Sequence, residues 1–158
     1  MKRYGYVVAI LCIVILIRPV VEKEYDLIVG VTGYKYEYGI RIDDDDTIIS
    51  GYVFKDIAIG IVVWASNTII RDCIFIHCSD EGIVLFSTGS DNSIIDCIFI
   101  DCCDGIELQQ AHNTTIKNCE FIRSYHAGID IIGNPSYNTR VIDCIFEDNK
   151  MDIYGLQG

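Results

Sequence analysis

A nine-residue motif that returns about every 23 residues is the feature that most constrains how this chain folds. It reads NTIIRDCIF, DNSIIDCIF, NTTIKNCEF and NTRVIDCIF, with a weaker first copy, DTIISGYVF. The copies align on one phenylalanine column: Phe54, Phe75, Phe99, Phe121 and Phe146. A Gly-Ile-x-aliphatic unit recurs at similar spacing, beginning at Gly39, Gly60, Gly82, Gly105 and Gly128. A repeat this short cannot bury its own apolar side, so successive copies must stack around a shared core.

Within each copy, apolar residues form short alternating runs that are separated by Asn, Asp and Gly. In one copy Ile94, Cys97 and Phe99 alternate with polar or variable neighbours. Such runs are too short for helices and predict strands of three to five residues joined by tight corners. A leucine-rich repeat has a similar period, but it needs leucine at most core positions and a helical half. We therefore predict an all-β fold, a right-handed single-stranded parallel β-helix of about five to six short rungs, preceded by an N-terminal hydrophobic helix.

The combined pattern N-x-x-I-x-D/N-C-x-F and G-I-x-L resembles the parallel β-helix repeat family over residues 39–158. That family includes NosD-like copper-associated periplasmic proteins and carbohydrate-acting pectate lyase-like folds. The resemblance implies the fold but no single function, because this scaffold serves lyases, hydrolases, epimerases and binding proteins. The polygalacturonase motifs N-T-D, G-H-G and R-I-K do not occur in the sequence. Arg123 is the residue that best matches the catalytic arginine of the lyases.

The N-terminal region divides into two further segments. Lys2 and Arg3 precede an apolar run at residues 4–17, and this arrangement is typical of a secretory signal. We assign residues 1–21 to a signal peptide or signal anchor, residues 22–45 to an N-terminal cap with a first partial rung, and residues 46–158 to the repeats. An alternative is that the apolar run forms a buried helix of the domain. The alternating run at residues 34–42 predicts a strand with Tyr38 and Ile42 on one face.

The signal predicts that the protein is secreted or at the cell surface, with residues 4–21 as its membrane anchor if they are retained. The formal net charge of -11 argues against a nucleic-acid partner, because an acidic body repels phosphate. The sequence DIYGLQG at the C-terminus stops within a rung and leaves an open strand edge. We expect end-to-end self-association there, or a chain that is part of a longer β-helix.

The cysteines form two columns, Cys73, Cys97, Cys119 and Cys144 in one and Cys78 and Cys102 in the other. Three interpretations remain open. The thiols can serve as small buried hydrophobic groups, which explains their spacing without a ligand. They can form disulfides between rungs. They can hold zinc through Cys73 with Cys78, through Cys97 with Cys102, or through Cys103.

Two columns of Asp and Asn recur at rung corners. One contains Asp46, Asn67, Asp91, Asn113 and Asn138; the other contains Asp72, Asp96, Asn118 and Asp143. Their recurrence in every rung favours a turn-forming role, in which short polar side chains bond the local backbone. The alternative is a calcium site built from these oxygen ligands. We assign no resident cofactor and no metal ligand, and calcium is the cation we consider.

The strongest candidate site begins two residues after each phenylalanine, where Asp56, His77, Asp101, Arg123 and Asp148 alternate acid with base. This column can be an outward ladder of complementary charges. It can also be a carbohydrate site, with an acid, a base and a guanidinium in one cluster. For that site we predict catalytic roles for His77, Asp101, Arg123 and His126. We predict ligand-binding roles for Asp80, Glu81 and Asp104.

Three functions follow from these patterns. The first is an exported or membrane-tethered surface protein that is non-catalytic and either binds glycan or acts as an interaction scaffold. The second is a polysaccharide lyase or glycoside hydrolase that uses the His77, Asp101 and Arg123 face. The third, by resemblance to the NosD-like proteins, is an accessory role in metal handling. Short loops and absent catalytic motifs favour the first, with a polysaccharide or surface glycan as the partner.

Overall fold

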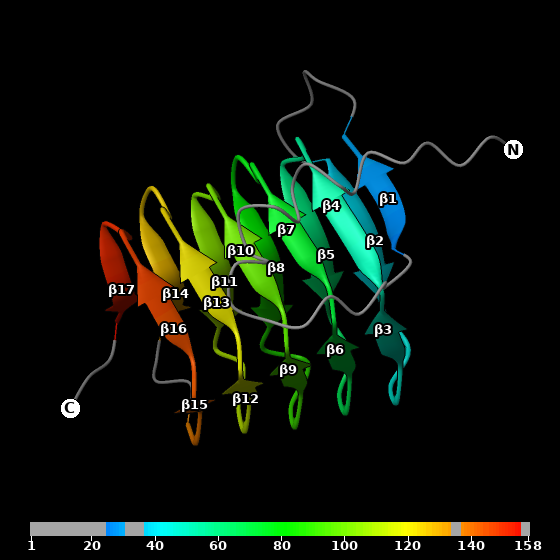
Figure 1. Cartoon of the computed structure of the whole chain (residues 1–158). Coiled ribbons are helices and arrows are strands. Elements are labelled where there is room, and N and C mark those ends of the chain that lie inside the picture. Colours follow the sequence, from blue (N-terminus) through cyan, green and yellow to red (C-terminus); the bar gives the residue numbers. More distant parts are fainter. Residues whose placement is uncertain (1–24, 31–36, 134–136, 156–158) are drawn as a thin grey trace, which may run out of the picture.

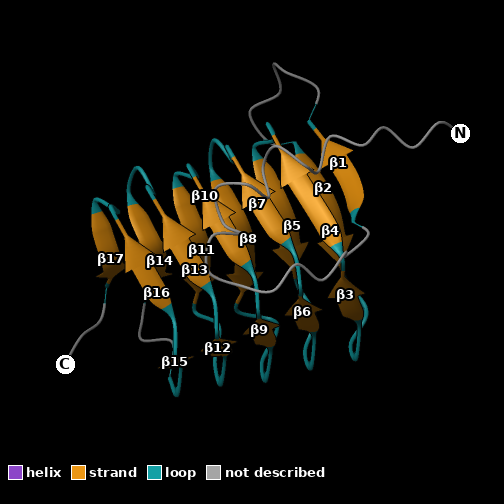
Figure 2. Ribbon diagram, in the orientation of Figure 1, coloured by secondary structure: helices purple, strands orange, loops and turns teal. Residues whose placement is uncertain are grey.

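The computed structural model describes residues 25–30, 37–133 and 137–155. These residues fold into three parallel sheets that wind into a solenoid, with strands joined by loops and turns (Figure 1, Figure 2). The prediction of an all-β parallel β-helix is therefore confirmed. The hydrophobic helix and the leader predicted at the N-terminus lie outside the described residues. Within the described ranges, no helix has the length and apolar character needed to span a membrane.

Each sheet takes one strand from every turn of the solenoid. Sheet A contains β1 (Asp26–Val29), β4 (Tyr52–Lys55), β7 (Ile74–Ile76), β10 (Ile98–Ile100), β13 (Glu120–Ile122) and β16 (Ile145–Glu147). Sheet B contains β2 (Tyr38–Ile42), β5 (Ile59–Val63), β8 (Glu81–Phe86), β11 (Asp104–Gln109), β14 (Ala127–Ile132) and β17 (Met151–Tyr154). Sheet C contains β3 (Ile48–Ser50), β6 (Ile69–Arg71), β9 (Ser93–Ile95), β12 (Thr115–Lys117) and β15 (Arg140–Ile142).

The chain passes through sheet C, then sheet A, then sheet B in each turn. From β3 to β17 this gives five complete turns, with β1 and β2 as a partial turn before them. This agrees with the five to six rungs predicted. In Figure 1 the turns follow one another from β1, in blue, to β17, in red, so positions one repeat apart in the sequence become neighbours in space.

The phenylalanine column forms a continuous aromatic stack inside the solenoid. Neighbouring ring centroids lie 4.8–5.0 Å apart, with interplanar angles of 3–11°. The glycine column is what makes room for it. A Cβ atom added to Gly82 would lie 2.6 Å from Cδ1 of Phe99 and 2.6 Å from the carbonyl oxygen of Gly105. The two columns that identified the repeat are therefore physically coupled, because the glycine of one turn accommodates the phenylalanine of the next.

This glycine also interrupts the alternation of side chains in sheet B. Both Gly82 and Ile83 face the interior, since a Cβ atom on Gly82 would point at the Phe99 ring and the side chain of Ile83 is fully buried. At the equivalent Gly39, Tyr38 is therefore 48% exposed while Ile42 is 3% exposed. The prediction that Tyr38 and Ile42 share a face is wrong, because a strict period of two does not continue through the glycine.

The Asp and Asn columns adopt the left-handed backbone conformation at the rung corners. Their φ values are 53–61° in the column that begins at Asp46 and 52–55° in the column that begins at Asp72. Asn and Asp are the non-glycine residues that tolerate this conformation best. The turn-forming interpretation is therefore confirmed. A third corner has φ values of 53–54° and contains the column that begins at Asp56, including His77 and Arg123.

The cysteine columns are interior and remain as thiols among the described residues. Cys97 is fully buried, and its Sγ lies 3.4 Å from the carbonyl oxygen of Ile95, within donor distance for a sulfur. Cys119 makes the equivalent contact at 3.4 Å with the carbonyl oxygen of Lys117. Burial raises the pKa of Cys97 well above its usual value, so this thiol stays protonated. These cysteines act as small buried groups in the core.

Candidate functional site

The seven residues predicted for the site separate into two groups. His77, Asp101 and Arg123 lie at the corner between sheets A and B, where with Asp56 they form what we term the charge ladder. Glu81, Asp104 and His126 lie at or beside the start of strands in sheet B. Asp80 directly precedes β8 and is half-buried, with its amide donating to the carbonyl of Ala58.

The charge ladder is an exposed chain of ion pairs. His77 Nδ1 lies 3.2 Å from Asp56 Oδ1, and its Nε2 lies 3.5 Å from Asp101 Oδ2. Arg123 donates to both oxygens of Asp101, at 2.8 Å each. The hydrogen bonds from Arg123 lower the pKa of Asp101, and the charges of Arg123 and His77 lower it further. Each charge in this group has an opposite partner, and the catalytic roles predicted for these residues stay predictions.

The second group is larger than the sequence predicted. Four acidic side chains lie side by side in β8, β11 and β14, where Glu81 pairs in register with Asp104 and Glu107 with Asp130. They are only 3–8% exposed. Together with His126, these four residues form what we term the acidic cluster. Charged residues are almost never this buried unless they are paired or bind a cation.

Sequence reasoning missed Glu107 and Asp130. Both occupy the variable position of the Gly-Ile-x-aliphatic unit, where earlier turns have Val62 and Val84. The signal was therefore a change from valine to acid in two successive turns. It was not recognised because alternation alone places this position on an outward, solvated face, whereas Val62 and Val84 are 7% and 2% exposed.

His126 contacts two of the four carboxylates in the acidic cluster. Its Nδ1 lies 2.9 Å from Asp104 Oδ1 and 3.5 Å from Asp130 Oδ2. Asp104 Oδ1 also accepts a hydrogen bond of 2.9 Å from the amide of Ala127. Asp130 Oδ1 is buried and has no hydrogen-bond partner among the described residues. The cluster therefore contains an acceptor whose hydrogen-bonding capacity is unused.

Burial raises the pKa values of these carboxyl groups. Desolvation, followed by the negative charges of Glu107 and Asp80, raises the pKa of Glu81 to about 9. Desolvation likewise raises the pKa of Glu107, and it raises that of Asp130 with a further contribution from Asp104. The salt bridges of the described residues bring no lysine or arginine to the cluster; the basic group they bring is the imidazole of His126. The excess negative charge must be met by protons or by a cation.

The donor atoms of Asp104, His126 and Asp130 lie within 4.8 Å of one another, and this group contains no cysteine. An imidazole with two carboxylates is a donor set for a divalent metal ion, with the nitrogen favouring transition metals over calcium. The zinc interpretation placed on the cysteine columns gains no support from this group. Calcium binding at the corner columns stays a prediction.

An aromatic platform lies on the same sheet as the acidic cluster, where the rings of Trp64 and Phe86 stack with centroids 3.9 Å apart and an interplanar angle of 3°. The guanidinium of Arg41 lies 5.8 Å from the Trp64 ring centroid. Phe86 pairs in register with Gln109, which donates a hydrogen bond to Glu107. The aromatic platform therefore leads, from one turn to the next, into the acidic cluster.

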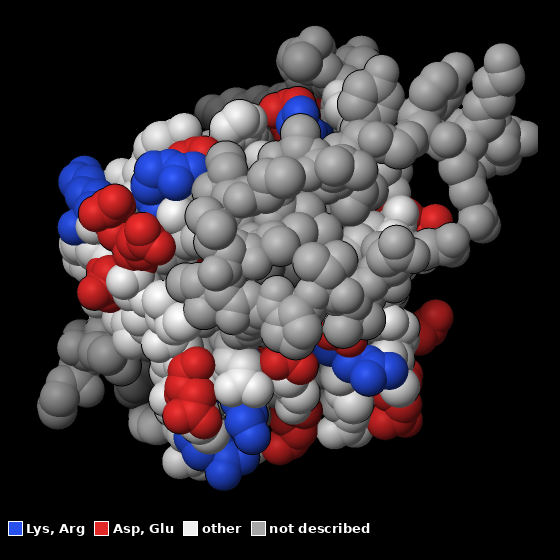
Figure 3. All heavy atoms as spheres, viewed as in Figure 1, with Lys and Arg blue, Asp and Glu red and all other residues white. Residues whose placement is uncertain are grey.

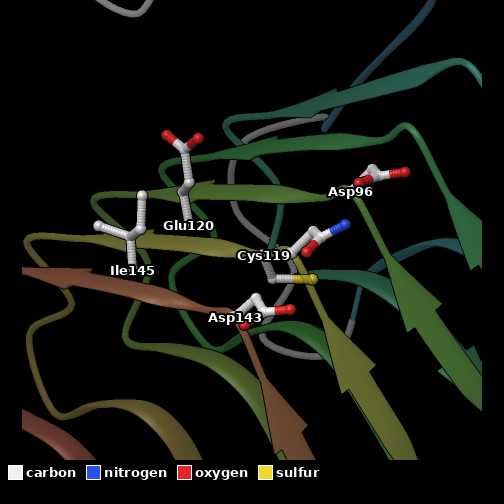
Figure 4. A pocket seen from close by; sticks show the side chains of 6 residues that line it. Asp96, Cys119, Glu120, Asp143 and Ile145 are labelled. Atoms are coloured by element: carbon white, nitrogen blue, oxygen red, sulfur yellow. The ribbon is translucent and has the colours of Figure 1, made fainter.

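A separate hollow of about 260 Å³ opens at the corner between sheets C and A. Asp96, Cys119, Glu120, Asp143 and Ile145 line it, as Figure 4 shows, together with Asn118. Asp96, Asn118 and Asp143 are left-handed corner residues, so their oxygens already have a structural reason to gather there. This hollow includes none of the predicted site residues.

Charge on the visible face is mixed. In Figure 3 acidic and basic side chains lie beside one another at the left and along the lower edge, and they do not form one patch of single sign. A phosphate backbone needs a basic stripe. The absence of a nucleic-acid partner nevertheless stays a prediction from the net charge.

Stacked parallel strands with Asn and Asp at their corners define a parallel β-solenoid as the class of this protein. The family model described as "Right handed beta helix region" matches residues 20–157. The chain therefore belongs to the right-handed β-helix family. No match was found among curated proteins.

Proposed function

We propose that this protein is a non-catalytic β-helix that binds glycan through the outer face of sheet B. The observation that carries the proposal is the aromatic platform of Trp64 and Phe86, which continues into Gln109 and the acidic cluster. Trp64 and Phe86 cover one face of each other and the Arg41 guanidinium lies over Trp64, so the stacked pair offers an apolar strip of ring edges against which the C–H groups of a sugar ring can pack. The adjoining side-chain amide of Gln109, which is half-buried, supplies a hydrogen-bond partner for hydroxyl groups.

The charge of this face points to the class of glycan. The acidic cluster and the net charge of -11 disfavour a polyanion, so we expect an uncharged polysaccharide. A repeating ligand also suits a repeating surface, because successive turns offer equivalent positions about 4.8 Å apart. As an exported or surface-tethered protein, it would meet such polymers outside the cell. Fractionation of cells producing the full chain tests this location.

The test is binding of the full chain to an array of neutral and acidic polysaccharides, followed by titration calorimetry with the neutral polysaccharide that binds best. Trp64→Ala should weaken binding at least tenfold. Tyr125→Ala is the matched control, since this tyrosine is 62% exposed and lies outside the platform. Equal affinity of wild type and Trp64→Ala, with both folded by circular dichroism, would contradict the proposal. So would a preference for acidic polysaccharides.

A polysaccharide lyase or glycoside hydrolase remains the second candidate, and the observation in its favour is Glu81. A carboxyl with a pKa of about 9 keeps its proton at neutral pH, as a general acid must. Product analysis of the bound polysaccharide separates the two candidates. New reducing ends or unsaturated products that disappear in Glu81→Gln would favour the enzyme. Loss of products in His77→Ala would favour the charge ladder as its site.

End-to-end association and the metal-handling role are separate predictions. In the last turn Ile145 is 54% exposed and Tyr154 is 50% exposed, and both are apolar surfaces that a further strand layer would cover. Sedimentation of the full chain at increasing concentration tests the association. A copper-handling role has weaker support, because Cu(I) favours thiolate and thioether ligands, whereas Asp104, His126 and Asp130 offer carboxylate and imidazole.

A further inference from the structure

We propose that Asp104, His126 and Asp130 form a binding site for one divalent transition-metal ion of the zinc or manganese type. The ligands are Nδ1 of His126 and one carboxylate oxygen from each aspartate. The site lies on the outer face of sheet B and does not include the aromatic platform. Binding of glycan at the platform and of metal at this site are thus separately testable.

The first support is the spacing of the donor atoms. His126 Nδ1 lies 2.9 Å from an oxygen of Asp104 and 3.5 Å from an oxygen of Asp130. With metal–ligand bonds of about 2.1 Å, neighbouring ligand atoms are separated by roughly 3.0 to 3.4 Å in octahedral or tetrahedral coordination. Both separations from the imidazole nitrogen are therefore close to those that coordination requires, and all three donor atoms lie within 4.8 Å of one another.

The second support is the unused oxygen of Asp130. The Asp130 side chain is 4% exposed, and its Oδ1 has no hydrogen-bond partner among the described residues. Leaving a buried carboxylate oxygen without a partner costs about 1–3 kcal/mol or more. A cation placed between Asp130, Asp104 and His126 would satisfy this carboxylate directly. The surrounding backbone explains one oxygen of Asp104, through the amide of Ala127, but among the described residues it offers no donor to Oδ1 of Asp130.

Charge balance gives the third support. Two ionised aspartates and a neutral imidazole carry two negative charges, which a divalent ion neutralises. Without the ion, Nδ1 of His126 must carry a proton to lie 2.9 Å from a carboxylate oxygen of Asp104. Metal binding therefore breaks the Nδ1–H bond and forms the metal–nitrogen bond; the proton is balanced at Nε2 when the imidazole is neutral, and goes to the buffer when both ring nitrogens carried a proton.

The fold explains why the three residues meet. Asp104 begins β11, Asp130 lies in β14, and His126 directly precedes β14. Asp104 pairs in register with Ala127, the residue after His126. Asp130 is four residues beyond His126, past the glycine that interrupts alternation, and it lies on the same outer face. Two adjacent turns thus supply two ligands from strand positions and the third from the residue directly before a strand, and strand positions hold side chains more firmly than loops do.

The test uses the full chain after removal of metals by a chelator, titrated with Zn²⁺, Mn²⁺ and Ca²⁺ by calorimetry in two buffers of different ionisation enthalpy. We expect one Zn²⁺ or Mn²⁺ per chain, with weaker binding of Ca²⁺. Asp130→Asn, which keeps the shape of the side chain, should weaken binding at least tenfold. His126→Gln should do the same.

Two control variants make the result specific. Asp101→Asn changes an aspartate of the charge ladder and should bind as wild type does. Cys103→Ser removes the half-buried thiol beside Asp104 and should also leave binding unchanged. Asp130→Asn removes a buried charge, so it should fold, and its melting temperature should no longer rise with Zn²⁺. Unchanged binding in Asp130→Asn, or loss of binding in Cys103→Ser, would overturn the proposal.

Discussion

The charge ladder and the acidic cluster both place acidic side chains and a histidine on consecutive turns, yet their electrostatics differ. In the ladder, the side chains of His77 and Arg123 are 52% and 46% exposed, and Arg123 donates to both oxygens of Asp101. In the cluster, four acids are 3–8% exposed and share a single imidazole. Position decides the outcome. At a corner, stacked charges are screened by water and pair freely, whereas on a covered sheet face they need a proton or a cation.

The largest expected effect on stability comes from deleting the best-bonded acid of the cluster. Asp104→Ala leaves the buried amide of Ala127 without its side-chain acceptor and removes the nearer of the two carboxylates that His126 contacts. We expect a loss of about 3 kcal/mol in the free energy of unfolding, measured by urea denaturation. In the ladder, Asp101→Asn should cost less than about 1 kcal/mol. Asparagine is chosen there because φ of 53° at this position disfavours alanine. Equal losses of unfolding free energy in Asp104→Ala and Asp101→Asn would contradict the proposed difference in electrostatics between the acidic cluster and the charge ladder.

The two regions should also respond to pH with opposite sign. Glu81 has a pKa of about 9 in the folded chain and 4.5 as the ordinary value. Between these pH values the folded state holds a proton that the unfolded state lacks, so stability falls as pH rises. Asp101 has a lowered pKa, so its contribution is present above its ordinary value of 3.8 and is lost as pH falls.

Glu81→Gln tests the part of this pH dependence that comes from the cluster. Relative to wild type, the free energy of unfolding of the variant should rise by about 2 kcal/mol between pH 5 and pH 8. The reason is that glutamine has no buried carboxyl whose ionisation destabilises the folded state. Urea denaturation at several pH values measures the difference. A wild-type curve that stays flat from pH 5 to pH 8, or a variant that runs parallel to it, would mean that Glu81 titrates as an exposed acid does.

The smallest effect is expected at Arg123. Arg123→Asn removes the exposed ion pair with Asp101 but introduces a residue that prefers the left-handed conformation found there, with φ of 54°. Each contribution is below about 1 kcal/mol and they oppose each other, so stability should change by less than about 0.5 kcal/mol. Denaturation in low and in 1 M salt checks this, since salt removes the ion-pair part alone. A loss of several kcal/mol would show that the ladder is structural.

The sequence predicted the repeat units well because stacking makes them redundant. Phe99 and Gly82 each recur in neighbouring turns, and the same contact is made repeatedly. The candidate site was predicted only in part. Asp104, Glu81 and His126 were identified as candidates, but they were grouped with His77 and Arg123. The repeat pattern shows which residues lie in the same column, but it does not show which outward-facing columns are buried from solvent.

Glu107 and Asp130 show where the reasoning from sequence stopped. Both residues lie in one column, which contains Val62 and Val84 in earlier turns, so the change to acid is visible in the sequence. What it means depends on exposure: on a solvated face it would be unremarkable, and at 5% and 3% exposure it creates a buried acidic cluster. Exposure arises from all the neighbouring segments together, which a period of 23 residues does not describe.

By itself, the sequence determined the architecture of this protein: parallel turns, a phenylalanine core, and Asn or Asp at the corners. These follow from local conformational preference and from the need of each turn to bury its apolar side on the next. Only the tertiary structure decided which outward side chains meet. It paired Arg123 with Asp101 at a solvent-exposed corner, and it placed His126 in contact with the buried side chains of Asp104 and Asp130. The physical reason is that burial, which depends on every surrounding element, sets the cost of charge.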